Sequence, residues 1–295
     1  MAQLIDSLAT ERTRALHEMM ALLRGRRIIL GQQEAPRTGS VCREIEWIEA
    51  VSGEEPALLG LDFIKEDYEG VAERALRWNE RSGNVTLCHH TGVAGGGYPD
   101  SRDETPDWEK LFTDGTNERG LLLARWEREA RALDRLQRED VPVLWRPYHE
   151  FDGGWFWWGK GGGEAFIRLW REMVARFTRE YGLHNLIWVL GYADDVREGW
   201  YPGDEYCDIA GSDTYRSETA HSSSYRRLKA LVPDKLLCFH ECGKLPPVER
   251  FFAEGCPWSY VMPWHSRFMF DNGPARIRQV YTDERSVTLR RLPKF

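Results

Sequence analysis

The sequence predicts a (β/α)8 TIM barrel that is formed by one domain, residues 1–295. Three observations favour this fold. About eight short apolar segments recur along the chain, and most are followed by a helical or loop segment. Their apolar runs are nearly continuous, as in parallel strands buried on both faces. No linker, low-complexity segment or change of composition divides the chain, and barrels of about this length commonly form a single domain.

Apolar residues at helical spacing predict a first helix over residues 3–24, before the first strand, and Gly25 ends it. The strands are predicted at residues 27–33, 57–63, 84–90, 141–150, 185–192, 207–215, 235–243 and 258–265. Helices are predicted between them at residues 65–79, 119–138, 164–181, 222–231 and 247–254.

The alternative fold is a doubly wound open sheet, which would need a Gly-rich nucleotide motif after an early strand. The glycines at 161–163 follow an aromatic segment instead, so the sequence favours the barrel.

The charges exclude nucleic acid as a partner. The chain carries 40 Lys and Arg against 47 Asp and Glu, a net charge of −7, and no basic stripe stands out. No apolar run is long enough to cross a bilayer, so no membrane is expected. The first residues lack a basic and apolar signal segment. We therefore expect a secreted protein whose signal has been removed, or otherwise a cytoplasmic one.

The six cysteines are scattered and several lie in predicted strands, which favours free buried thiols over disulfides. Strand alternation places Cys238, His240 and Cys242 on one face, but no fourth ligand lies close in sequence. No metal site and no cofactor are predicted.

The fourth strand leads into the segment that carries the most chemistry, residues 145–159. Arg146, His149 and Glu150 follow a buried run, and a turn then leads into four aromatic residues at 155–158. On one strand Arg146 and Glu150 would share a face. Sugars bind to aromatic platforms flanked by fixed polar groups, so the segment predicts a carbohydrate site. The alternatives are an aromatic run that forms core and a His–Glu pair that only satisfies its own hydrogen bonds.

A second carboxylate, Glu241, lies on the seventh strand, which faces the fourth across the mouth of the barrel. Two carboxyls about 5–5.5 Å apart would cleave a glycosidic bond with retention of configuration. Glu150 would be the general acid/base, with its pKa raised by burial beside Trp155. Glu241 would be the nucleophile, kept ionised by Arg146 and Tyr215. The alternative for Glu241 is a structural ion pair.

The sequence His-Glu-Phe-Asp-Gly-Gly-Trp-Phe-Trp-Trp-Gly at 149–159 resembles the signature of glycoside hydrolase family 26, best known for endo-β-1,4-mannanases. A His before the acid/base Glu is characteristic of this family. The resemblance implies a retaining (β/α)8 hydrolase that uses Glu150 and Glu241. It further implies that the substrate is bound by His90, Arg146, His149, Trp155, Asp213, Tyr215 and Trp264.

The third strand departs from the family pattern. His89 stands where the family more often has Trp, and Thr91-Gly92 replaces a common Asn-Pro. Both changes lie near the subsites on the non-reducing side, and the loop at 91–117 would decide whether the cleft is open or blocked. Strand alternation turns one of His89 and His90 inward, and the resemblance selects His90. His265 is expected to be solvated.

The leading hypothesis is a monomeric endo-β-1,4-mannanase acting on β-mannan polysaccharide or manno-oligosaccharide. The alternatives are an exo-acting member that releases mannobiose or processes oligosaccharides, and a member that acts on β-1,3-xylan or mixed-linkage β-glucan. A non-catalytic carbohydrate-binding relative is disfavoured because both carboxylates and Arg146 are present. A sugar-phosphate enzyme is disfavoured because no Gly-rich phosphate loop follows the seventh or eighth strand.

Overall fold

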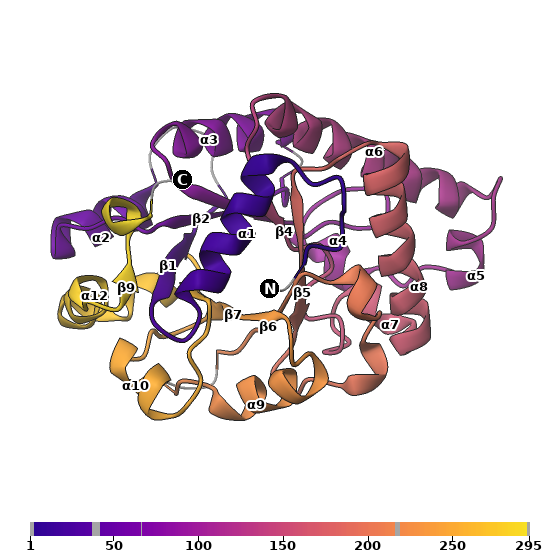
Figure 1. The fold of residues 1–295 in the computed structure, drawn as a ribbon. Helices are drawn as coiled ribbons and strands as arrows, with labels where there is room; N and C mark the ends of the chain where they lie inside the picture. The colour runs from indigo at the N-terminus through magenta and orange to yellow at the C-terminus, as the bar shows by residue number, and fades with distance from the viewer. Residues whose placement is uncertain (1–2, 37–41, 66, 216–218, 294–295) are drawn as a thin grey trace.

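A computed structural model describes residues 3–36, 42–65, 67–215 and 219–293, and these form a closed ring of parallel strands surrounded by helices (Figure 1). The ring runs in the order β1 to β8, and pairing of β1 with both β8 and β2 closes it, so the predicted TIM barrel is confirmed. Its strands are β1 Ile28–Gln33, β2 Leu58–Asp62, β3 Asn84–Cys88, β4 Val143–Trp145, β5 Leu186–Tyr192, β6 Ile209–Ser212, β7 Leu236–Cys242 and β8 Tyr260–Pro263.

A short ninth strand, β9 Ser286–Val287, was not predicted. It pairs with the first half of β1 on the edge that β2 occupies in the second half. Pro56, just before β2, forms a bridge with Thr288, so β9 lies beside the start of β1, where β2 does not reach.

The helices that cover the ring are α1 Glu11–Leu23, α2 Arg43–Ser52, α3 Tyr68–Glu80, α4 Tyr98–Asp103, α5 Trp108–Leu111, α6 Asn117–Arg138, α7 Trp157–Lys160, α8 Gly162–Ala175, α9 Ser222–Leu231, α10 Val248–Ala253, α11 Arg267–Phe270 and α12 Gly273–Thr282. A π-helical turn, η1 Arg176–Glu180, continues α8, and 3-10 turns lie at η2 Glu198–Trp200, η3 Asp204–Tyr206 and η4 Leu289–Arg291. None of the helices in the described ranges is long and apolar enough to span a membrane.

Several of these helices correct the sequence prediction, because α1 begins later than predicted and α2, α4, α5, α7, α11 and α12 were not predicted. The first helix begins at Glu11 rather than at residue 3, because the Thr10 side chain accepts a hydrogen bond from the Thr13 amide and starts the helix there. The helix α2 between the first two strands was missed. It is short, ends at Gly53 in the left-handed region (φ 73°), and places only Glu44, Ile45 and Ile48 in buried positions.

The apolar residues form two separate cores. The inner core fills the barrel and includes Leu58, Leu144 and Ile187 together with Leu16 and Met20 of α1. Figure 1 shows α1 lying across the ring of strands. The outer core packs the strands against the surrounding helices. Since α1 closes the end at which the strands begin, the opposite end, where the strands finish, is left for chemistry.

The fourth strand is much shorter than predicted. β4 ends at Trp145, and the chain then turns through residues 147–153. Tyr148 and Glu150 adopt left-handed backbone conformations, with φ of 52° and 51°, which no strand accommodates. The prediction that Arg146 and Glu150 share a strand face is therefore wrong, because Glu150 reaches the mouth from a turn.

The seventh strand contains an irregularity that sequence alternation does not predict. Phe239 pairs with Val261 but Cys242 pairs with Pro263, so two residues of β7, His240 and Glu241, oppose one residue of β8. Such a β-bulge reverses the alternation beyond it. Cys238 consequently lies in the inner core and Cys242 in the outer core, which corrects the prediction that both share a face with His240.

The prediction of free thiols is confirmed. All six cysteines lie within the described ranges, and each is buried and unbridged.

Candidate active site

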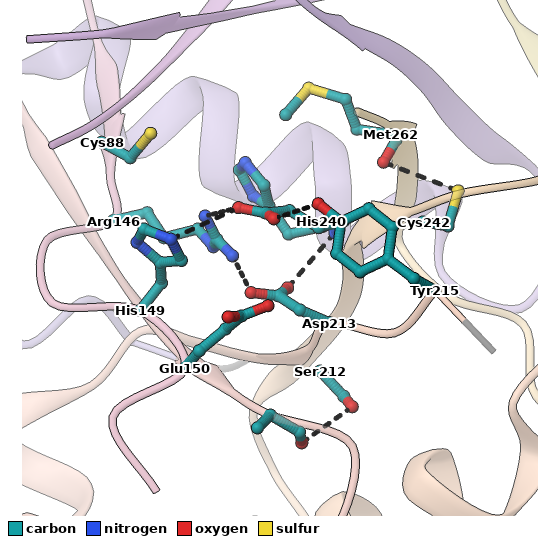
Figure 2. A network of polar contacts seen from close by, with 12 residues as sticks. Cys88, Arg146, His149, Glu150, Ser212, Asp213, Tyr215, His240, Cys242 and Met262 are labelled. Atoms are coloured by element: carbon teal, nitrogen blue, oxygen red, sulfur yellow. Dashed lines mark hydrogen bonds and ion pairs between the residues drawn. The ribbon is translucent and has the colours of Figure 1, made fainter. Parts of the chain in front are cut away.

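Three carboxyl groups meet at the mouth of the barrel. Glu150 comes from the turn after β4, Asp213 follows β6, and Glu241 lies in the bulge of β7. One oxygen from each lies within 4.8 Å of one from each of the others. Figure 2 shows Glu150 and Asp213 pointing toward the place where Arg146, His149 and Tyr215 also converge.

Glu241 accepts hydrogen bonds from two directions. Arg146 Nη1 lies 2.9 Å from Oε1, and Tyr215 Oη donates to Oε2 at 2.6 Å. His149 Nε2 lies 3.6 Å from Oε1. Arg146 is fully buried and also pairs with Asp213, so one buried guanidinium contacts two carboxyl groups, although burial raises the pKa of Asp213 well above its usual range. Asp213 in turn accepts the backbone N–H of Glu241 at 3.2 Å, which ties β6 to the bulge. The whole set holds the Glu241 carboxyl group in a fixed orientation.

Glu150 is in a different environment. Burial, and then the nearby Glu241 carboxyl group, raise the pKa of Glu150 to about 7, although the Arg146 charge and then a hydrogen bond from Trp155 Nε1 at 2.7 Å act in the opposite direction. Its backbone N–H is fixed by the Gly191 carbonyl at 2.7 Å. Near neutral pH this carboxyl therefore exists in both protonation states, beside a carboxylate that is held by two donors.

The raised pKa of Glu150 predicts a pH effect on stability. The folded chain holds this proton more tightly than the unfolded chain, so the stabilisation is complete below the ordinary Glu pKa of about 4.5 and is lost as pH rises through about 7. We expect the melting temperature of the wild type to decrease, relative to that of Glu150→Gln, as the pH is raised from 4.5 to 7.5. A difference between the two melting curves that does not change with pH would contradict this.

Two histidines, His90 and His149, lie beside the carboxyl groups. His90 Nδ1 lies 2.6 Å from Asp62 Oδ2, and the His90 ring packs edge-on against the rings of His149 (4.4 Å between centroids) and Trp264 (5.6 Å). Burial acts against the charged form of His90, but the Asp62 carboxylate outweighs it and the pKa of His90 is raised. His149 is neutral, because burial and then the Arg146 charge hold its pKa well below the usual range.

The two adjacent histidines point to opposite sides, as predicted. His89 turns away from the mouth and its Nδ1 lies 3.0 Å from Glu129 of α6, whereas His90 faces the carboxyls. His265 is partly exposed and pairs with the Ser266 hydroxyl at 2.8 Å.

The four aromatic residues after the turn have different roles. Phe156, Trp157 and Trp158 are buried, so the alternative that this run forms core is right for these three. Trp155 is 40% exposed beside Glu150, and Trp264 is half-buried on the other side of the mouth. Both are therefore open to a ligand.

One aromatic residue at the mouth escaped the sequence reasoning. Tyr98 lies in α4, within the segment predicted as a loop at 91–117, and it is 43% exposed. Its ring lies 5.5 Å from His90 and 6.2 Å from Phe156 between centroids. The length of the loop pointed to this region, but nothing in its sequence singled out Tyr98.

Two groups of side chains in the described part of the chain bring together enough metal-ligating atoms to hold an ion. One is Asp62, Cys88 and His90, and the other is the three carboxyls Glu150, Asp213 and Glu241. In the first cluster Asp62 and His90 are hydrogen-bonded to each other, and in the second Asp213 and Glu241 pair with Arg146.

Comparison with known proteins identifies the family. The sequence profile of glycosyl hydrolase family 26 matches residues 5–288. A mannan endo-1,4-beta-mannosidase of Thermothelomyces thermophilus is 30% identical over 302 residues, which cover 94% of this chain and 60% of that protein.

Two crystal structures are similar in fold. One is a GH26-CBM35 β-(1,4)-mannanase of Podospora anserina, with a TM-score of 0.88 and 29% identity over 99% of this chain and 69% of that one. The other is a ruminal GH26 endo-β-1,4-mannanase, with a TM-score of 0.91 and 28% identity over 99% and 71%. The chain spans 51–60% of the length of three curated relatives that it matches. On the strength of the profile match, the chain belongs to glycosyl hydrolase family 26.

Proposed function

We propose that this chain is an endo-acting β-1,4-mannanase that cleaves with retention of anomeric configuration. The observation that carries the proposal is the pair of Glu150 and Glu241, whose nearest oxygens lie within 4.8 Å and whose surroundings differ. This distance is close to the separation of about 5–5.5 Å in retaining enzymes and well below the roughly 6.5–9.5 Å of inverting ones. The mannan specificity is supported by relatives that are named mannan endo-1,4-beta-mannosidases.

In the first step the Glu241 carboxylate attacks the anomeric carbon, and the bond to the leaving oxygen breaks as Glu150 gives that oxygen its proton. Glu150 suits this role because it still holds a proton at a pH near 7. Arg146 and Tyr215 fix the attacking carboxylate, with one hydrogen bond to each of its oxygens.

In the second step Glu150, now ionised, takes a proton from water, and the water oxygen attacks the anomeric carbon. The bond to Glu241 breaks and the carboxylate returns to its two donors. Each step inverts the anomeric centre, so the product keeps the configuration of the substrate.

The mouth supplies surfaces for a sugar chain on both sides of the carboxyls. Trp155 offers an exposed face beside Glu150, and His90, Trp264 and Asp213 border the same space. Rings of this kind bind the flat C–H faces of sugars, and the polar groups select hydroxyls.

A polysaccharide panel tests this proposal. We expect hydrolysis of mannan and galactomannan with products of mixed length from the earliest times, and a first-formed product with the β configuration by NMR. Mannobiose as the sole early product would indicate exo action instead. Activity confined to β-1,3-xylan or to lichenan, or a first product with the α configuration, would contradict the proposal.

A further inference from the structure

A cluster of ionisable side chains lies behind the active site and has no part in the two steps above. Arg125 and Glu129 of α6 and His89 after β3 are all fully buried. Arg125 Nη1 lies 3.4 Å from Glu129 Oε1, and His89 Nδ1 lies 3.0 Å from the same oxygen. Burial of charged groups costs stability even when they are paired, so such a cluster calls for an explanation.

The cluster converges on one hydroxyl group. Arg125 Nη2 and Trp126 Nε1 both donate hydrogen bonds to Tyr148 Oη, at 2.5 Å and 2.7 Å. The His89 ring packs edge-on against the Tyr148 ring, with 4.7 Å between centroids. Arg125 is itself anchored, because its Nη1 also donates to Thr91 Oγ1 at 3.0 Å. Tyr148 is therefore held on its ring and at its hydroxyl by a rigid, fully buried surround.

Tyr148 is also one of the two residues that shape the turn leading to the candidate acid. It lies two positions before Glu150, and both residues have the left-handed backbone that non-Gly side chains rarely adopt. Such a conformation is destabilising for a residue other than glycine and persists only where the surroundings enforce it. The carbonyl of His149, between them, accepts a hydrogen bond from Trp158 Nε1 at 2.7 Å. The hydroxyl of Tyr148 is thus the point at which α6 can fix the turn.

We propose that Tyr148 is a positioning residue, through which Arg125 and Trp126 of α6 hold the left-handed turn that aims the Glu150 carboxyl at the leaving oxygen. This rests on the proposed function. The hydrogen bonds and ring contacts of the Tyr148 side chain are with α6, His89 and α7. Tyr148 acts only through the turn, and its loss displaces the acid/base without removing it.

The test is Tyr148→Phe, which keeps the packed ring and removes only the hydroxyl. We expect kcat/KM for mannotetraose to fall about 10- to 100-fold, because small displacements of a catalytic group have effects of this size. For 2,4-dinitrophenyl β-mannobioside kcat/KM should fall less than about threefold, because this leaving group departs without a proton. KM for mannotetraose should change little. Azide should raise kcat for the aryl substrate, since azide attacks the glycosyl-enzyme without a general base.

Two further variants make the result decisive. Trp126→Phe removes the second donor to the same hydroxyl, and the double variant should lose less than the product of the two single losses. Ile277→Val, in the buried face of α12, removes one methyl group and should lower the stability about as much as the loss of one hydrogen bond. It should leave both substrates and the azide response unchanged. If Tyr148→Phe fails to fold, Trp126→Phe alone must show the same selective loss.

Equal losses on the two substrates, no loss on either, or multiplicative losses in the double variant would overturn the positioning role. Glu150→Ala serves as the reference. If it too shows no dependence on the leaving group, the proposed function fails. If it shows that dependence and Tyr148→Phe does not, only the positioning role fails.

Discussion

Glu241→Gln is expected to lower kcat for mannan by about 10⁴- to 10⁶-fold, the loss that follows removal of a nucleophile. The side chain keeps its size, but an amide does not attack the anomeric carbon. Arg146 would retain Asp213 as its partner, so the fold should persist with a somewhat lower melting temperature. The measurement is the rate of reducing-end release from mannan, with the melting curve recorded on the same sample.

Asp208→Asn is the matched control for Glu241→Gln. Asp208 is equally a buried carboxyl, but it lies before β6 at the opposite end of the barrel, where it accepts the backbone N–H groups of Ile5 and Trp188. Its replacement should lower the melting temperature and leave kcat within about twofold, because it contacts no group at the mouth. Undiminished hydrolysis by Glu241→Gln would remove Glu241 from the mechanism.

Glu150→Ala is expected to separate substrates by their leaving group. Hydrolysis of mannan needs a proton on the departing sugar, so kcat/KM should fall by about 10²- to 10⁴-fold, the usual contribution of a general acid. An aryl β-mannobioside with a dinitrophenol leaving group should lose little in kcat/KM. Its turnover should become limited by the second step, which still needs a base.

Azide provides the second measurement on Glu150→Ala. It should accelerate turnover of the aryl substrate and yield a β-glycosyl azide, because the anion reaches the anomeric carbon from the face that water would use. The wild-type kcat/KM for mannan should decline as pH rises through about 7, where Glu150 loses its proton, and this decline should be absent from the variant. Equal losses on the polymer and the aryl substrate would contradict the acid/base role.

The sequence was sufficient to predict the barrel and most of the residues that meet at its mouth, although Tyr98 was missed. Buried parallel strands appear in sequence as continuous apolar runs. Their last residues meet at one end of the barrel, and this does not depend on where the intervening helices begin or end. Arg146, Asp213 and Glu241 could therefore be brought together from their positions at or near strand ends alone. The missed helix α2 shows the limit, because it buries few side chains and its apolar pattern is correspondingly weak.

Two local departures from regular structure could not be predicted from alternation. The bulge in β7 admits both His240 and Glu241 to the interior and turns Cys242 outward, and it depends on how β7 pairs with β8. The left-handed residues Tyr148 and Glu150 look like a continued strand in sequence. The turn that contains them is in contact with Arg125 and Trp126 of α6, which are distant along the chain, and with Trp157 and Trp158 of α7.

The buried cluster of Arg125, Glu129 and His89 behind the turn could not be predicted either, because it also depends on contacts between distant parts of the chain. Arg125 and Glu129 are four residues apart on a helix rich in charge, and this spacing normally indicates a solvated ion pair. Only the packing of α6 against β3 and the turn shows that both are fully buried. The sequence shows which residues of a helix are charged, but it does not show whether their side chains are buried.

The closed end of the barrel has a practical consequence. Leu4 near one end of the described chain and Leu292 near the other both pack against the inner core beneath the ring, on the side where α1 lies. A bead or a fluorescent label attached to this face would lie away from the carboxyls. Immobilising the chain through this face should therefore leave the mouth of the barrel accessible.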